Sequence, residues 1–99
     1  MLFAIVGRDV EDSLAKRRAL RPAHLERLQA LEAAGRLVLA GPFPALAAED
    51  PGPAGFTGSL VVAEFESLEA ATTWAQSDPY ATGGVFREVS VRPFRQVLP

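Results

Sequence analysis

His24 is the residue best suited to acid–base chemistry, and it is the only histidine in the chain. Pro22 favours the start of a helix, because proline at the first helical position loses no hydrogen bond. His24 would then lie near the beginning of that helix and, from its spacing to Leu28 and Leu31, on its apolar side. Burial and the positive end of the helix dipole would both favour the neutral imidazole that a general base needs. A structural histidine bonded to backbone or to a carboxylate is the alternative interpretation.

Asp78 is the acidic residue whose setting suggests a partner for His24. It lies in the segment Ser77-Asp78-Pro79-Tyr80, and aspartate followed by proline is typical of a helix N-terminus. The carboxylate could therefore act only as a helix cap. It could also orient the imidazole and stabilise its protonated form, as the acid of a catalytic triad does. The sequence leaves both roles open, and one carboxylate can fill both.

Three arginines and a Gly-Pro pair are candidates for binding a substrate. Arg17, Arg18 and Arg21 precede His24, and guanidinium groups bind carboxylates and phosphates. Clusters of this kind are more often a solvated helix face. Gly41 and Pro42 end a predicted strand, where glycine would let a ligand approach the backbone, although turn formation explains them equally well.

The composition excludes several classes of site. Without cysteine there is no disulfide, thiolate nucleophile or cysteine-ligated metal, and a single histidine makes any other metal site unexpected. The phosphate-binding and dinucleotide-binding motifs and the G-x-S-x-G elbow are missing, so no cofactor and no serine hydrolase is expected. A formal charge of −2 gives no reason to expect binding to nucleic acid or to an anionic membrane.

The length predicts a single domain that spans residues 1–99. The apolar run at 2–7 ends at Arg8 and is too short for a signal peptide or a membrane span. A fold without disulfides also suits a reducing compartment. These features lead us to expect a cytoplasmic protein.

The spacing of apolar and turn residues predicts the element order β-α-β-β-α-β. Strands are expected at 2–7, 36–43, 57–65 and 85–97, and helical segments at 12–19, at 22–34 and after Ser67, with a loop at 44–55. This order is typical of an α+β, ferredoxin-like βαββαβ fold, in which a four-stranded antiparallel sheet carries both helices on one face. The other face would be apolar and exposed, so we expect a homodimer packed sheet against sheet.

An ordered set of short motifs resembles the YCII-related (YciI-like) family of bacterial proteins over essentially the whole chain. The motifs are Lys16-Arg17-Arg18, Arg21-Pro22-Ala23-His24-Leu25, Gly35-Arg36-Leu37, Ala40-Gly41-Pro42, Gly55-Phe56-Thr57-Gly58-Ser59, residues 63–71, Asp78-Pro79-Tyr80 and residues 89–94. The resemblance implies a dimeric α/β barrel with a pocket between helices and sheet. It also implies active-site roles for His24 and Asp78, and it makes Tyr80 a pocket candidate.

The favoured hypothesis is a small-molecule enzyme that needs no metal. His24 would move a proton, Asp78 would orient it, and the arginine cluster would hold an anionic substrate. The resemblance agrees, because one relative is a dehydrochlorinase acting on a chlorinated aromatic diol and the wider fold group includes lactone isomerases. The reaction would be elimination, isomerisation or hydrolysis of a small cyclic or aromatic acid. The alternative is a non-catalytic dimer that binds a small ligand, or a stress-related accessory protein.

Overall fold

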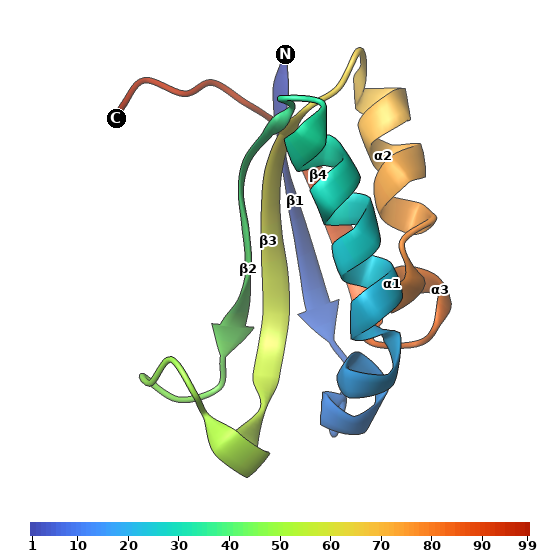
Figure 1. Ribbon diagram of the computed structural model, residues 1–99, viewed down its shortest axis with the longest axis vertical. Helices are drawn as coiled ribbons and strands as arrows, with labels where there is room; N and C mark the ends of the chain where they lie inside the picture. Colours follow the sequence, from blue (N-terminus) through green and yellow to red (C-terminus); the bar gives the residue numbers. More distant parts are fainter.

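The computed structural model describes residues 1–99 and forms an antiparallel sheet with helices on one face (Figure 1). Its elements are β1 (Leu2–Asp9), α1 (Leu14–Ala33), β2 (Leu37–Pro44), the 3₁₀ turn η1 (Gly52–Ala54), β3 (Phe56–Glu64), α2 (Leu68–Gln76), α3 (Pro79–Thr82) and β4 (Phe86–Phe94). The strand order is β2-β3-β1-β4, and every neighbouring pair is antiparallel. The predicted α+β, ferredoxin-like βαββαβ fold is confirmed. None of the helices combines the length and hydrophobicity that a membrane span requires.

The core lies between the sheet and the helices. Alternating residues of the central strands point into it, and the register pairs Phe3 with Ala63 and Ile5 with Val61. All four are at most 5% exposed. The helices complete the core with the small or apolar side chains of Leu28, Leu31, Ala71 and Ala75. The apolar residues that alternate along β1 and those that recur at helical spacing along α1 therefore pack together in one apolar layer.

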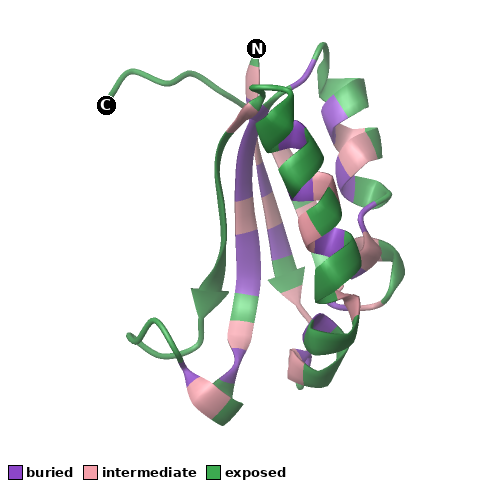
Figure 2. Ribbon diagram, viewed as in Figure 1, coloured by how far each residue is buried: buried purple, intermediate pink, exposed green.

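The opposite face of the sheet carries no helix (Figures 1 and 2). Cross-strand partners share a face of a sheet, so Leu39, which pairs with Val62, lies on this side, as do Phe43 and Phe94. Leu39, Phe43 and Phe94 are 48%, 40% and 41% exposed. Large apolar side chains at such exposure form a surface that water solvates poorly.

The expected break between two helices before Pro22 is wrong. A single helix, α1, runs through Pro22, and Arg21 is helical despite preceding a proline. An interior proline costs about 3 kcal/mol in lost hydrogen bonding and steric conflict. Burial of Arg17, His24 and two leucines along one side of α1 outweighs that cost. His24 therefore lies in mid-helix, and the positive helix end does not act on it. The first and last strands of the chain also differ from the prediction, since β1 continues to Asp9 and β4 ends at Phe94.

Candidate active site

His24 and Asp78 lie in direct contact beneath the helices. Nδ1 of His24 is 2.8 Å from Oδ2 of Asp78, and the two residues are 8% and 3% exposed. Asp78 is also the N-cap of α3, because its Oδ2 accepts the backbone N–H of Tyr80 at 2.9 Å. The carboxylate thus caps α3 and contacts the imidazole at the same time. Its backbone is fixed by the turn that starts α3, so the cap aims the second lone pair of Oδ2 at the histidine.

The ring of His24 is held so that one nitrogen stays free. An ionised carboxylate only accepts hydrogen bonds, so Nδ1 carries a proton and donates it to Asp78. Nε2 has no hydrogen-bond partner, and it is not one of the fully enclosed atoms of the molecule. The ring of Tyr80 stacks on the imidazole, with 3.9 Å between centroids and 9° between planes. The hydrogen bond and the stacking together fix the orientation of the imidazole.

Arg27 is a third member of this group that the sequence analysis missed. Its Nη1 donates to Oδ1 of Asp78 at 3.1 Å and to the backbone carbonyl of Trp74 at 3.0 Å. Its guanidinium also lies 4.4 Å from the centre of the Trp74 ring. Arg27 follows His24 by three residues on α1, and that spacing puts two side chains on the same helix face. The spacing was the available signal, but nothing in the sequence indicated that Asp78 would be opposite.

Arg17 is buried next to the dyad, in a second charged cluster. Its Nε and Nη2 donate to the two carboxylate oxygens of Asp9 at 2.6 and 2.9 Å. Nη2 also donates to the hydroxyl of Ser59 at 3.0 Å and to the backbone carbonyl of Gly58 at 2.8 Å. The hydroxyl of Ser13 donates to Asp9 as well. Sequence analysis identified Arg17 but neither of its partners, although Asp9 is only eight residues away in the chain, whereas Ser59 is 42 residues away.

Tyr80 links the two clusters. Its ring stacks on the imidazole of His24, and the guanidinium of Arg17 is 5.1 Å from the ring centre. Its hydroxyl donates to the backbone carbonyl of Arg17 at 3.3 Å. Burial raises the pKa of Tyr80 above its ordinary value, although the charges of Arg17 and Arg21 partly oppose this. Tyr80 is therefore a neutral phenol near pH 7.

The remaining predicted binding residues do not touch the dyad. Arg18 and Arg21 are exposed on α1. Of these two, only Arg21 affects the pKa of Tyr80. Gly41 and Pro42 lie on the edge strand β2, exposed, and line neither of the two pockets described next. Their role in binding a substrate stays a prediction. No three histidine or acidic side chains converge as a metal site would require.

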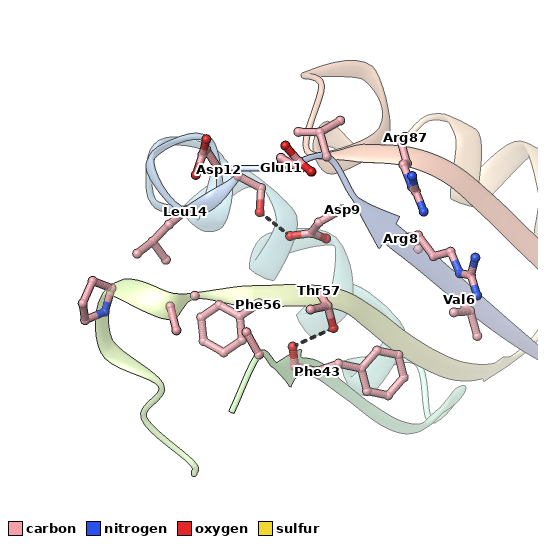
Figure 3. Close-up of a pocket in the computed structure, with 17 residues that line it drawn as sticks. Val6, Arg8, Asp9, Glu11, Asp12, Leu14, Phe43, Phe56, Thr57 and Arg87 are labelled. Carbon is pink, nitrogen blue, oxygen red and sulfur yellow. Dashed lines mark hydrogen bonds between the residues drawn. The ribbon is translucent and has the colours of Figure 1, made fainter. Parts of the chain in front are cut away.

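Two spaces lie near these clusters. The first is a hollow of about 10 Å³ beside the dyad, lined by His24, Asp78, Gly7, Trp74 and Phe86 among others. The second is an outer pocket of about 950 Å³ at the end of the sheet (Figure 3). Its walls come from the β1–α1 turn, from the residues around η1 and from the starts of β3 and β4. Figure 3 shows Arg8 and Arg87 on one side of this pocket and Asp9, Glu11 and Asp12 on another. Gly7 lines both spaces.

Comparison with known proteins gives the family. Residues 1–95 match the YCII-related domain. The chain belongs to the YCII-related family. It is 60% identical to Protein YciI from Escherichia coli O6:H1 over 98 residues, which is 99% of this chain and all of that protein. An uncharacterized protein from Haemophilus influenzae is 50% identical over the same coverage.

A solved structure of another protein resembles this YCII-related chain in fold. It is the 5-chloro-2-hydroxyhydroquinone dehydrochlorinase TftG from Burkholderia phenoliruptrix AC1100, in complex with 2,5-dihydroxybenzoquinone. The TM-score is 0.82 and the sequence identity 29%, with 96% of this chain and 94% of that chain covered. A protein with this fold therefore acts on a small aromatic compound.

Proposed function

We propose that this protein is a small-molecule enzyme in which His24 is the general acid–base and Asp78 orients it. The observation that carries the proposal is the 2.8 Å contact between Nδ1 and the carboxylate, with Nε2 left free. In its neutral form the imidazole would present the lone pair of Nε2 to a substrate, and the negative charge of Asp78 would stabilise the imidazolium once a proton has been taken. The dehydrochlorinase relationship supports elimination or isomerisation of a small oxygenated ring compound as the reaction class.

Each residue of the dyad and around it would have its own role in the reaction. Nε2 takes a proton from the substrate and returns it to the product or to water. Arg27 fixes Oδ1 of Asp78 through a charge-assisted hydrogen bond of 3.1 Å. Tyr80 stays protonated and holds the imidazole plane by stacking. The apolar lining of the hollow keeps water away from the reacting atoms, which strengthens the interactions between charges.

We also propose that the protein acts as a homodimer in the cytoplasm. The helix-free face of the sheet supports a dimer, because Leu39 and Phe43 are exposed on it and a second copy would cover them. Replacement of Leu39 by arginine should convert a dimer to a monomer in analytical ultracentrifugation. A monomeric wild-type protein would contradict the proposal.

A turnover screen tests the enzymatic proposal. Small lactones and halogenated or hydroxylated aromatics are incubated with wild type, with His24→Gln and with the control Glu26→Gln, an exposed acid on the same helix. Turnover by wild type and the control, with a loss of at least about 100-fold in His24→Gln, is expected for a general base. Ligand binding without turnover in all three proteins would instead indicate a non-catalytic binding protein.

A further inference from the structure

The hollow beside the dyad is too small for a cyclic substrate. Its volume of about 10 Å³ is the space of one water molecule, whereas a cavity that accepts benzene measures about 150 Å³. If the proposed function holds, a side chain that lines the hollow must move to admit a ring. The identity of that side chain follows from the packing around Gly7.

Phe86 occupies a ring-sized space next to the dyad. It lines the hollow together with His24 and Asp78. The tip of its ring packs directly against Gly7. A Cβ atom on residue 7 would lie only 2.5 Å from Cζ of the ring, so only glycine leaves room for it. The ring also stands edge-on to Tyr80, at 5.7 Å between centroids and 88° between planes. The Phe86 ring therefore packs against a glycine and an aromatic ring, and these contacts would also suit another planar ring.

Phe86 is not part of the hydrophobic core. It is only partly buried, whereas its neighbour Val85 is completely buried. Phe86 begins β4 opposite Asp9, at the point where the register of the sheet shifts. Asp9 and Arg87 both line the outer pocket. A rotation of the Phe86 side chain toward that pocket would join the two spaces across Gly7, and such rotamer changes are fast for partly exposed residues.

We propose that a planar six-membered ring bearing hydroxyl or carbonyl oxygens binds in the place of the Phe86 ring, between Gly7 and the dyad. Phe86 covers this site when it is empty. The inference rests on the proposed function and names its ligand class. The ring would contact the apolar residues Ile5, Val61 and Val89, which already line the hollow, and its oxygens would face His24 and Ser59.

A fluorine label at Phe86 tests the displacement in the wild-type sequence. 4-Fluorophenylalanine is placed at Phe86 or, as a control, at Phe3, which lies in the core and lines neither space. Each protein is titrated with 2,5-dihydroxybenzoquinone while the imidazole signals of His24 are followed. We expect His24 and the label at Phe86 to shift together and the label at Phe3 to stay unchanged.

The other outcomes separate this inference from the proposed function. A response of His24 without one at Phe86 would overturn the displacement and leave the proposed acid–base site intact. A response at Phe86 alone would place the ring away from the dyad and also overturn the inference. No response at either residue would overturn the ring ligand, and the turnover screen would then decide the proposed function alone.

Truncation of Phe86 provides a second test. If the open arrangement is populated at the few-per-cent level or less, Phe86→Ala should bind the quinone roughly tenfold or more tightly than wild type. Binding is measured by quenching of Trp74, the only tryptophan, which lines the hollow. Phe3→Ala removes the same group from the core and should not raise affinity. If Phe86→Ala does not fold, Phe86→Leu should show a smaller gain. Affinity equal to wild type in the folded variant would refute the inference.

Discussion

Replacement of Asp78 by asparagine would isolate the charge of the dyad from its geometry. Asp78 accepts three hydrogen bonds, from His24, Tyr80 and Arg27. Asparagine has one oxygen, so it can keep the two bonds to Oδ2 or the one to Oδ1. The backbone N–H of Tyr80 is buried, whereas the Arg27 side chain is 26% exposed and can turn to water. We therefore expect the amide oxygen to take the place of Oδ2, which leaves the imidazole tautomer unchanged.

The expected magnitudes follow from the loss of that charge. The negative charge of Asp78 stabilises the imidazolium that forms when His24 takes a proton, and asparagine removes that charge. A loss of about 1.4 kcal/mol in this stabilisation corresponds to a turnover rate about tenfold lower. The lost bond to Arg27 should cost about 1–3 kcal/mol of folding stability.

Nitrogen-15 NMR of the single histidine measures its tautomer. Glu26→Gln removes an exposed acid from the same helix and serves as the matched control. Urea unfolding gives the change in stability, and the turnover assay gives the rate. A turnover rate in Asp78→Asn equal to that of wild type would refute the coupling on which the site depends. A switched tautomer, with a far larger rate loss, would show instead that the amide nitrogen faces the imidazole.

Three further predictions concern the neighbouring groups. Arg27→Gln should lower folding stability by about 1–3 kcal/mol, because it removes the partner of Oδ1 of the buried Asp78; urea unfolding measures this, and unchanged stability would contradict it. The raised pKa of Tyr80 predicts that folding stability does not depend on this group below pH 10.0 and falls as pH rises through the higher folded value. Urea unfolding between pH 9 and 12 should show this extra decrease in wild type but not in Tyr80→Phe. Asp9→Asn should lower folding stability by about 3–5 kcal/mol, because it leaves Arg17 buried without its partner. The double replacement of Asp9 by leucine and Arg17 by methionine should lower folding stability by less. Equal losses of stability in the two variants would argue against a tight ion pair.

The fold could be predicted from the sequence because its signals are local. Apolar alternation near Phe3 and the caps at Ser67 and Asp78 identify elements within a few residues of themselves, and the order of those elements restricts the topology. The break at Pro22 was wrong for a physical reason. The proline signal is also local, but the packing that overrides it comes from β1, β3 and α2, which are distant in sequence.

The site could be predicted only in part. His24 is unique in its chemistry, and Asp78 has a cap signal, so the sequence marks both. Their contact spans 54 residues, and no spacing rule encodes it. Arg27 and Asp9 carry ordinary charged side chains, and only the folded chain shows which of the ten basic and twelve acidic residues are paired inside. The alignment of Phe86 with Gly7 likewise depends on the register between β1 and β4.

All the basic groups of the site come from a single helix, whereas their acids come from elsewhere. Arg17, His24 and Arg27 follow one side of α1, while Asp9 ends β1 and Asp78 begins α3. Docking of α1 onto the sheet therefore gives two buried carboxylates their partners in the same step that brings His24 to Asp78. A folding intermediate without docked α1 would leave both carboxylates without these partners and would lack the proposed acid–base pair. Catalytic competence and cooperative folding should accordingly appear together in time, and amide hydrogens of α1 should exchange only through global unfolding.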